Sequence, residues 1–505
     1  MASFIDRYRD RMAGELSCYD RVVIQGILQS LCYAKGMEAC LRAHNIRFFD
    51  FSKFVKPLRD QIQTHAAELA KANGIKIQYL RNHEERKEDI VSKILERRGQ
   101  APGLVAILST LEKCRTYEAR YDKSTGRSYL INDWSKCLHY YFYFIDEDLG
   151  LCFLRVATWC PFGLKFYFNG HNLLASKLRK AGIEFTMIDN AFATIADWDK
   201  AQTLADELET QWLQQKLNSY VHTYCPAVET LEIPYYWTLA QVEYSTDLVF
   251  RKQSYLCPIY DALVRTAAHA VKADDIATFL GKQLRSTNSE QIGNNFHVRI
   301  QGSRIKHSMG PVSIKMYDKA GLILRIETTT NDPSWFSHYR TVAHRDGTSS
   351  FANAHLKKSI FSLHDLRQLA AAANRRYLAF LSDLDDPTCA FEALDDVTAK
   401  VQDHDRGYAG FNFFAKDDVR LFEVVLRGEN TLSGMRNGDL RTHLPDKTPG
   451  QVSRLLKRMW LHGLIKKVAH SYKYYISDLG RKLMVMGLKL KELHLIPELA
   501  RALAT

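Results

Sequence analysis

The sequence lacks the features that would place it in several common classes of protein. Ten cysteines are present, but no CxxC pair occurs, which argues against a zinc ribbon. No apolar run approaches the roughly 18 residues that a membrane-spanning helix needs. The first twenty residues also lack the apolar segment of a secretory signal. We therefore expect a reduced, cytoplasmic protein without a membrane-spanning segment.

Glycine-rich phosphate loops are missing as well. None follows any of the segments that read as strands, so the sequence offers little support to a nucleotide-binding enzyme. Internal repeats and low-complexity tracts are also absent. With 46% hydrophobic and 25% charged residues over 505 positions, the chain has the balance of a globular protein with about three domains.

The chain does have an excess of positive charge. It contains 69 Lys and Arg against 57 Asp and Glu, a formal net charge of +12. Residues 415–505 hold 17 of these basic residues and 9 of the acidic ones, so two thirds of the excess lies in less than a fifth of the chain. Such a basic segment favours an anionic partner such as nucleic acid, and a solubilising surface is the alternative.

Three helices followed by a hairpin are predicted in this basic segment. Apolar residues recur on one face of each helix, Thr448 and Pro449 form a helix start, and Gly463 forms a helix stop. The helices are expected over residues 416–427, 433–444 and 449–463, the strands over 464–468 and 472–477, and a last helix over 478–486. This order is typical of a winged helix, whose recognition helix lies in the major groove of DNA.

The third helix and the hairpin supply the expected nucleic-acid contacts of this segment. On the helix, the outward residues are Gln451, Ser453, Arg454, Lys457 and Arg458. On the hairpin, the residues expected to meet phosphate are Lys466, Lys467, His470 and Lys473. Phosphate contacts give affinity without sequence information, so base recognition is assigned to the helix.

The run QVSRLLKRMWLHGLIKKV, followed by YKYYISDLGRKL, resembles the recognition helix, wing and following helix of MarR-type bacterial winged-helix proteins. The resemblance covers residues 417–490 and implies duplex DNA as the partner. A winged helix that serves protein contacts is the alternative. Over its full length, the chain resembles a group of bacterial proteins that share the ASFIDRYRDRMAG opening and the KHSMGPVSIKMYDK block and look associated with mobile elements.

The rest of the chain has the mixed signals of an α/β (α+β) multidomain body that precedes the C-terminal winged-helix domain. Strands alternate with helices near the N-terminus, including a helix over residues 87–98, which favours partly parallel pairing. The expected divisions are an α/β domain over 1–115, a β-rich α+β domain over 116–200, a helical segment over 201–290, a hairpin region with a helix over 291–385, a linker over 386–414 and the winged helix over 415–505.

Carboxylates on or next to expected strands are the candidate catalytic residues. Metal-dependent phosphodiester chemistry needs two or three carboxylates that converge on Mg²⁺. The candidates are Asp20, Asp146, Asp148 and Glu327, with Asp146 and Glu327 as metal ligands. The alternatives are structural: Asp146 and Asp148 fit a hairpin turn, Glu327 fits an ion-paired strand residue, and Asp20 fits a surface pair with Arg21.

A block of basic strands adds a second set of expected nucleic-acid contacts, which are Arg304, Lys306, His307 and Lys315. In the same block, KMYDKAGLILRIE resembles a segment of phage and plasmid replication initiators. Those enzymes cut DNA with a tyrosine nucleophile and bind metal with a His-hydrophobic-His pair. This chain has no His-x-His triplet, so Tyr317 is expected to pack across strands instead.

Aromatic residues are dense in the strands between residues 140 and 168. Bases stack on exposed aromatic rings beside basic residues, so this segment also suits RNA or a single strand. Successive strand residues face opposite ways, and at least half of these rings are therefore expected in the core. The rings are Tyr140, Phe142, Tyr143, Phe166, Tyr167 and Phe168, near Arg155 and Lys165.

Two classes of function follow from the sequence. The first is a DNA-binding protein of a mobile element, such as a transposase, recombinase or metal-dependent nuclease anchored by its winged helix. The second is a non-enzymatic transcriptional regulator whose body binds a ligand or a partner. An RNA-binding component of a ribonucleoprotein is a further alternative. The length of the chain favours the first class, and a dimer is compatible with each of them.

Overall fold

An eleven-stranded sheet organises the first of two units in the chain, which are Met1–Ser382 and Asp383–Thr505. The computed structural model describes residues 4–81, 86–282, 292–299, 302–344, 346–385, 394–427, 430, 434–468 and 471–503. No helix among them combines the length and the apolarity needed to cross a lipid bilayer. The mixed α/β class expected from the sequence is confirmed.

The pairing in this sheet is antiparallel except at one edge. Its strand order is β10-β11-β12-β13-β9-β1-β6-β5-β4-β3-β2, and the short edge strand β2 lies parallel to β3. The partly parallel layer expected near the N-terminus is thus reduced to one pair, because the long β3–β4 hairpin brings in an antiparallel neighbour. The strands are β1 (Met12–Ile27), β2 (Ile77–Tyr79), β3 (Gly103–Asp122), β4 (Arg127–Asp146), β5 (Gly150–Ala157), β6 (Leu164–Asn169), β9 (Tyr236–Phe250), β10 (Ile292–Arg299), β11 (Gly302–Met309), β12 (Val312–Lys319) and β13 (Ile323–Thr330).

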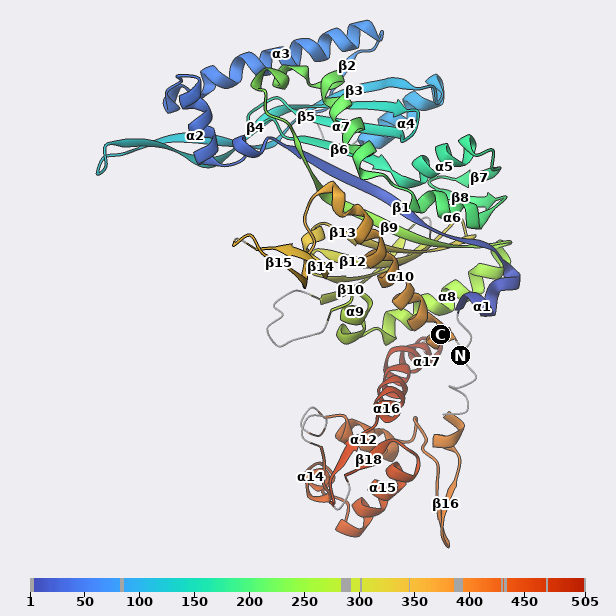
Figure 1. Ribbon diagram of the computed structural model, residues 1–505. Helices are drawn as coiled ribbons and strands as arrows, with labels where there is room; N and C mark the ends of the chain where they lie inside the picture. The colour runs from blue at the N-terminus through green and yellow to red at the C-terminus, as the bar shows by residue number, and fades with distance from the viewer. Residues whose placement is uncertain are drawn as a thin grey trace. The chain divides into compact units, whose positions relative to one another are not determined.

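Strands β1 and β9 run side by side through the middle of the sheet (Figure 1). Their register shifts between Tyr19 and Val22, and this bulge sets Asp20 and Arg21 of β1 opposite one residue of β9, Glu243. A bulge of this kind re-aims side chains locally.

Strand β9 lies within the range 201–290, for which only a helical segment is expected. Its sequence, YWTLAQVEYSTDLVF, is rich in β-branched and aromatic residues, which favour strands. The flanking helices do occur, as α7 (Thr210–Tyr224) and α8 (Gln253–Ala270). All four divisions expected before residue 385 contribute strands to the one sheet.

Helices cover one face of the sheet, which we name the helix-covered face. Tyr220 of α7 packs on Phe144 of β4 with a ring-centroid distance of 4.9 Å. On the other half of the sheet, Asn374 of α10 (Leu363–Asp385) donates to the carbonyl oxygen of Tyr244 at 3.2 Å and accepts a hydrogen bond of 2.7 Å from Thr328.

Successive side chains of a strand point to opposite faces of the sheet, so every second side chain points to the other face, which we name the polar face. In register across neighbouring strands, it carries Glu243, Ser245 and Asp247 of β9, Arg325, Glu327 and Thr329 of β13, and Lys315 and Tyr317 of β12. Helix α5 (Gly170–Lys180) and the hairpin of β7 (Phe185–Ile188) and β8 (Ala191–Ile195) border this face at β1, where His171 and Asn190 reach Arg325. Over β4 and β5, helix α4 (Lys87–Arg98) packs on the same face. The polar face is the part of the fold that positions the candidate site.

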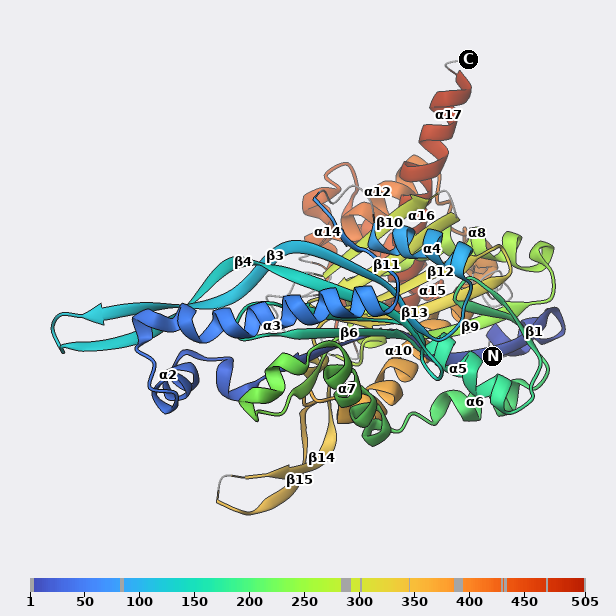
Figure 2. The same cartoon turned by 90° about the horizontal axis from the view of Figure 1, so that it is seen from above.

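The remaining elements of the first unit surround the sheet. Helix α3 lies along the β3–β4 hairpin, and the hairpin β14–β15 projects from the sheet (Figure 2). Their bounds, with those of the other elements, are α1 (Phe4–Tyr8), α2 (Ala34–Ala43), α3 (Phe51–Ala72), α4 (Lys87–Arg98), α5 (Gly170–Lys180), β7 (Phe185–Ile188), β8 (Ala191–Ile195), α6 (Trp198–Asp206), α9 (Ala273–Phe279), β14 (Ser337–Ala343) and β15 (Ser349–His355).

The second unit has its own small hydrophobic core. Val452, Leu456 and Met459 of α15 are buried against Phe422 of α12, and Met435 pairs with Tyr474 as a short third strand of the hairpin. Its elements are α12 (Lys416–Val425), α14 (Asn437–His443), α15 (Pro449–Leu461), β18 (Ile465–Lys467), β19 (Tyr474–Ile476), α16 (Asp478–Leu490) and α17 (Ile496–Leu503).

The range expected as a linker, 386–414, contributes to this second unit from residue 394 onward. Val397, Phe411 and Phe413 are buried in its core. Between them lies a short hairpin of β16 (Val401–Asp403) and β17 (Arg406–Tyr408). These apolar side chains explain why the segment packs on the helices instead of remaining extended.

Replacement of Asn374 tests how α10 is fixed to the sheet. In Asn374→Ala, the buried hydroxyl of Thr328 and the carbonyl oxygens that Asn374 bonds lose their partner. Each unsatisfied buried group costs about 1–3 kcal/mol, so we expect the free energy of unfolding to fall by at least about 2 kcal/mol in urea titrations. The control Asn353→Ala, on exposed β15, should leave it unchanged. Equal midpoints for the two variants would contradict this role.

Candidate active site

A fully buried arginine, Arg325 of β13, joins the central strands on the polar face. Its guanidinium donates two hydrogen bonds of 2.6 Å to Asp247 of β9 and one of 3.0 Å to Asp20 of β1. It also donates to the carbonyl oxygen of Asn190 at 3.1 Å. Asp20, Asp247 and Arg325 are 5%, 1% and 0% exposed, so these charges face one another and not water. The planar fork of five donors makes arginine suited to this bidentate pairing.

His171, at the start of α5, completes this group. Its Nε2 lies 3.0 Å from the Arg325 guanidinium and 3.6 Å from Asp247. Although burial opposes the charged form, the surrounding groups, Cys18, Asp20 and Asp247 among them, raise the pKa of His171 well above its ordinary value. Its Nδ1 is 3.5 Å from Asp20. Asp20 also accepts hydrogen bonds of 2.7 Å from the side chains of Asn169 and Asn190. Asn169 is the N-cap of α5, so the strand-to-helix turn itself brings His171 to the sheet.

Three carboxylates meet next to this group. Asp20, Glu243 and Glu327 each offer an oxygen atom, and the three atoms lie within 4.8 Å of one another. They belong to the neighbouring strands β1, β9 and β13. Asp20 and Glu327 are buried, whereas Glu243 is partly exposed, so the cluster opens to solvent at Glu243. Carboxylate oxygens are the hard ligands that Mg²⁺ prefers, and the donor set fits a divalent cation.

Lys315 and Tyr317 of β12 extend this carboxylate cluster. The Lys315 ammonium lies 2.5 Å from Glu327 and 3.2 Å from Glu243. The Tyr317 hydroxyl donates to the other oxygen of Glu327 at 2.7 Å, and the Thr329 hydroxyl donates to Glu327 at 3.2 Å. Tyr317 thus has a polar partner in addition to its packing. A cation bound by the cluster would compete with Lys315 for two carboxylates.

Several cationic groups surround the carboxylates of the combined site. The carboxylates are Asp20, Glu243, Asp247 and Glu327, and the cations in contact with them are Arg325 and Lys315. A further cation, Lys319, donates to the side chain of Asn190. Buried charge without a partner is costly. His171, whose pKa is raised well above its ordinary value, lies next to Asp20 and Asp247 and adds positive charge to this balance.

The pKa values of the carboxylates follow from these surroundings. Burial and the neighbouring Glu327 raise the pKa of Glu243 above its ordinary value. Burial alone would raise the pKa of Asp20, but the hydrogen bond from His171 and the charge of Arg325 lower it. The burial of Asp247 is likewise outweighed by Arg325, and its pKa is lowered. Of these three groups, Glu243 is the one that most readily holds a proton.

Basic residues continue the polar face beyond the carboxylates. Lys306 of β11 pairs in register with Lys315, and Arg304 pairs with Tyr317, so both share the face of the cluster. Three of the four basic residues expected on these strands, Arg304, Lys306 and Lys315, are thereby brought to the candidate site.

His307 lies on the opposite, helix-covered face. Its ring is fully buried, and its two nitrogens lie 2.7 Å from Asn294 and 2.9 Å from Tyr377. This corrects the expectation of a nucleic-acid contact at His307, because alternation along β11 turns the ring into the core.

Asp146 and Asp148 lie in the turn between β4 and β5, apart from the carboxylate cluster. Asp146 accepts from the backbone N–H groups of Asp148 and Leu149 at 2.9 and 3.0 Å, and from the hydroxyl of Tyr220 at 2.7 Å. Lys216 pairs with both aspartates, at 3.1 and 2.8 Å. These contacts stabilise the tight turn between β4 and β5 and attach it to α7. They match the alternative of a hairpin turn, and the carboxylate cluster includes neither Asp146, expected as a catalytic and metal-binding residue, nor Asp148, expected as a catalytic one.

Arg458 of α15 does not face outward as expected. Its guanidinium pairs with Asp418 at 2.8 and 3.0 Å and donates to the carbonyl oxygens of Ala409 and Gly410. It also lies 3.8 Å from the ring centroid of Phe411. With its side chain only 16% exposed, Arg458 fastens α15 to the preceding segment, which occupies the side of the helix expected to be open.

The other residues expected to bind nucleic acid in the second unit differ in their exposure. Arg454 is exposed, and Lys457 is partly exposed and pairs with Asp403 at 3.0 Å. Gln451 and Ser453 each have a hydrogen-bond partner within the unit. On the hairpin, Lys466 and Lys467 are exposed, Lys473 is half-buried, and His470 lies outside the described residues.

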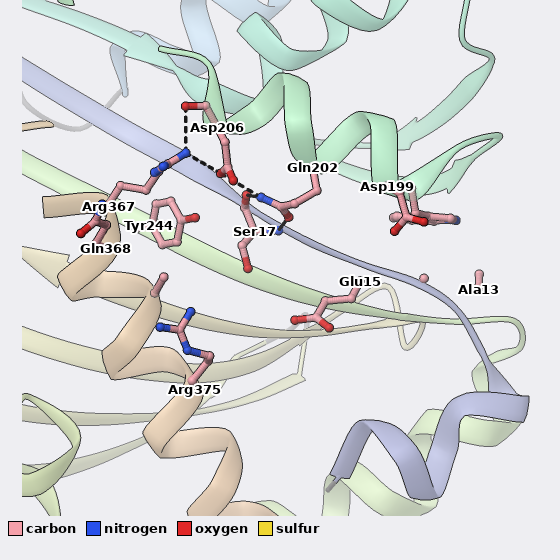
Figure 3. A pocket seen from close by; sticks show the side chains of 13 residues that line it. Ala13, Glu15, Ser17, Asp199, Gln202, Asp206, Tyr244, Arg367, Gln368 and Arg375 are labelled. Carbon is pink, nitrogen blue, oxygen red and sulfur yellow. Dashed lines mark hydrogen bonds and ion pairs between the residues drawn. The ribbon is translucent and has the colours of Figure 1, made fainter. Parts of the chain in front are cut away.

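A separate cleft of about 790 Å³ lies between β1, α6 and α10 (Figure 3). Arg367 pairs with Asp206 there at 2.7 Å, and Gln202 hydrogen-bonds the backbone of β1 as a neighbouring strand would. Among the described residues, Glu15 and Arg375 have no ion-pair partner within 4 Å, and burial raises the pKa of Glu15. The cleft thus offers one acid and one base to a polar molecule.

Comparisons with known proteins identify no family for this chain. No protein-family model matches it, and no curated protein matches its sequence. Among solved structures, the rolling circle replication initiator protein from Geobacillus stearothermophilus matches over 63% of this chain and 75% of that chain, at 7% identity and a TM-score of 0.19. A TM-score this low does not establish a shared fold, so the functional argument depends on the site alone.

The sequence pattern indicates two of the three carboxylates, Asp20 and Glu327, but not Glu243. Asp247 is missed as well, whereas His171 is among the histidines, with His139 and His307, that the sequence suggests could line a site, a buried hydrogen-bonded ring being the alternative. Glu243 and Asp247 lie in β9, which the helical expectation for 201–290 conceals. The signal that identifies them is a period of two, since Glu243, Ser245 and Asp247 share one side of a strand.

Removal of the buried arginine should destabilise the protein in a pH-dependent way. In Arg325→Met, Asp20 and Asp247 lose their cation, and breaking a buried pair costs about 3–5 kcal/mol. The pKa values of both carboxyl groups are lowered in the native protein. The ionised carboxylates therefore contribute fully to the free energy of unfolding above their unfolded pKa of about 3.9, and this contribution is lost as the pH falls through the folded pKa values. The difference from wild type in urea unfolding should therefore be largest near neutral pH and shrink in acid.

The matched control for this substitution is Arg120→Met, on the exposed end of the β3–β4 hairpin. It should leave stability unchanged at every pH. A loss of stability in Arg325→Met that is the same in acid as at neutral pH would show that the ion pairs are not its cause.

Proposed function

We propose that the protein is a DNA-processing enzyme that breaks a phosphodiester bond at the carboxylate cluster and holds duplex DNA with a C-terminal winged helix. The observation that carries the proposal is the meeting of Asp20, Glu243 and Glu327 beside Lys315, on a face that continues into Arg304 and Lys306. A cation held by carboxylates, together with a neighbouring lysine, can stabilise the negative charge that develops on a reacting phosphate. A nuclease, recombinase or transposase of a mobile element would share this chemistry.

Mg²⁺ is the cation that we assign to the cluster, since its three protein ligands would be carboxylate oxygens. When bound, it would polarise an oxygen of the scissile phosphate. Lys315 neutralises Glu243 and Glu327 in its absence and supplies positive charge to the phosphate in its presence. Tyr317 holds the orientation of Glu327 through its hydroxyl.

Water is the nucleophile that we favour for the cleavage step. Its oxygen forms a bond to phosphorus while the bond from phosphorus to the leaving nucleotide oxygen breaks, and that oxygen takes up a proton. Solvent, which reaches the cluster at Glu243, takes the proton that water loses and gives a proton to the leaving oxygen. Attack by the Tyr317 hydroxyl would instead leave DNA covalently attached to the protein, which gel analysis of the products distinguishes.

The order of elements in the second unit supports a winged helix of the MarR-like kind. Helices α12, α14 and α15 are followed by the hairpin β18–β19, with Met435 as the additional short strand. Arg454 on α15 and Lys466 and Lys467 on the hairpin are exposed cations available to phosphate or base edges.

A ligand-responsive regulator is the second candidate function. The cleft bordered by Glu15 and Arg375 favours it, because an acid and a base without ion-pair partners among the described residues would suit a small polar ligand. The carboxylate cluster has no role in that alternative, so the two functions separate in a cleavage assay.

Loss of one carboxylate should abolish cleavage without abolishing DNA binding. We expect Glu327→Gln to reduce Mg²⁺-dependent cleavage of DNA by more than about a hundredfold, since a transition-state contact of this kind is worth about 2.7–4 kcal/mol. Binding of duplex DNA by the second unit should stay at the wild-type level. The control Glu118→Gln changes an exposed carboxylate on the β3–β4 hairpin and should cleave normally. Wild-type cleavage by Glu327→Gln, or no cleavage by the native protein with any divalent cation, would refute the enzymatic proposal.

Two arginines of α15 should respond differently to substitution. Arg454→Gln is expected to weaken duplex DNA binding and to reduce the slope of log K against log salt by about 1, as removal of one cation from a phosphate does. Arg458→Gln removes the pair with Asp418 and should instead lower the melting temperature of the second unit. Fluorescence anisotropy at several salt concentrations, together with thermal unfolding, separates the two effects. An unchanged salt slope in Arg454→Gln would remove α15 from the DNA interface.

A further inference from the structure

The polar face carries a second feature beside the carboxylate cluster, a pocket of about 320 Å³. This volume is at the lower end of the range for small-molecule sites, which is about 300–1,000 Å³. The pocket has an aromatic floor of Tyr141, Tyr143 and Phe153 and a basic rim that includes Arg21, Lys87 and Lys165.

The floor is built from rings that share the polar face. Tyr143 and Phe153 lie in register across β4 and β5. Next to the floor, Tyr167 of β6 stacks on Phe153 with ring centroids 5.2 Å apart. The Arg21 guanidinium lies 5.0 Å from the ring centroid of Tyr167. Of the six rings that the sequence suggested for stacking, Tyr143 and Tyr167 lie on this face, and the others lie on the helix-covered face.

The rim has four cations, Arg21, Arg86, Lys87 and Lys165, and one carboxylate, Glu88. Glu112 is shared between Arg155 at 3.0 Å and Lys87 at 3.3 Å. Arg21 and Lys165 have no ion-pair partner within 4 Å in the part of the chain that the structure describes. Burial and the nearby Arg155 lower the pKa of Lys165, a sign that its charge lacks compensation. A bound anion would supply that compensation.

The pocket adjoins the carboxylate cluster through the bulge in β1. Arg21 directly follows Asp20, and both residues of the bulge serve the polar face, since Asp20 bonds Arg325 and Arg21 covers Tyr167. Asn169, two residues after Tyr167 on β6, donates to Asp20. A chain of phosphates that reaches the cluster would therefore pass next to the pocket.

We propose that this pocket takes one unpaired nucleotide of the DNA strand that enters the carboxylate cluster, with its phosphate on Arg21 and Lys165 and its base on the aromatic floor. The inference depends on the proposed function and names its substrate as single-stranded DNA at the point of cleavage. Stacking on aromatic rings beside cations is the mode by which proteins hold single strands, and in a duplex the bases are not available to such a pocket.

Binding without cleavage tests this assignment in the full-length protein. The probe is a single-stranded DNA oligonucleotide with one photoreactive 5-iodouracil, in EDTA, with excess unlabelled duplex DNA to occupy the second unit. The variant Arg21→Gln/Lys165→Gln is compared with the control Lys71→Gln/Lys200→Gln, which removes two exposed charges elsewhere in the first unit. Thermal unfolding of each variant verifies folding, and Lys165→Arg, which keeps the charge, should bind normally.

We expect the Arg21→Gln/Lys165→Gln variant to bind the oligonucleotide about tenfold more weakly, a change of about 1.4 kcal/mol. The slope of log K against log salt should fall by about 0.7 for each phosphate that the variant no longer neutralises, as is usual for single strands. The control should bind as wild type does. Mass spectrometry should locate the photo-adduct in peptides from β4, β5 or β6.

Unchanged affinity and salt slope in the Arg21→Gln/Lys165→Gln variant would overturn the inference, as would adducts confined to residues 383–505. Tighter binding of an RNA oligonucleotide of the same sequence would overturn the assignment to DNA. A protein that binds the strand here but cleaves no DNA would refute the proposed function alone. A protein that cleaves DNA but gives no adduct in the first unit would refute only this inference.

Discussion

The bidentate pairing of Arg325 with Asp247, extended to Asp20, is the interaction on which the first unit depends. A buried ion pair is tolerated only when nearly every donor and acceptor has a partner, because desolvation of the charges is costly. Here Arg325 of β13 has its partners on β9, on β1, at the start of α5 and in the turn at Asn190. The positions of five separate segments are therefore determined together.

The carboxylate cluster takes its geometry from this pairing. Asp20 belongs to both groups, so the oxygen that it offers to the cluster is held by the same contacts that balance the arginine. Glu243 and Glu327 stand on rigid strands within the sheet, and Lys315 and Tyr317 hold them from the next strand. Sites built on strands in this way are more precisely preorganised than sites built on loops.

Local patterns in the sequence predict many of the elements, though not β9, and only part of the site. The helix expected over residues 87–98 is α4, Lys87–Arg98, because its periodicity is local. The partners of Arg325 lie 78 and 305 residues away along the chain, and no local pattern encodes such pairings. Arg458 shows the same limit: its position on α15 suggests an exposed cation, but its partner Asp418 and the carbonyl oxygen of Gly410 come from another segment.

The bulge in β1 has a consequence for how the chain can vary. In a regular strand, neighbouring side chains face opposite sides, and a shift of one residue exchanges the two faces. The extra residue lets an acid and a base that are adjacent in sequence, Asp20 and Arg21, serve one face. Loss of a single residue at this point would leave one half of β1 in place and move each side chain of the other half to the opposite face of the sheet. Insertions and deletions should therefore be far less tolerated here than substitutions.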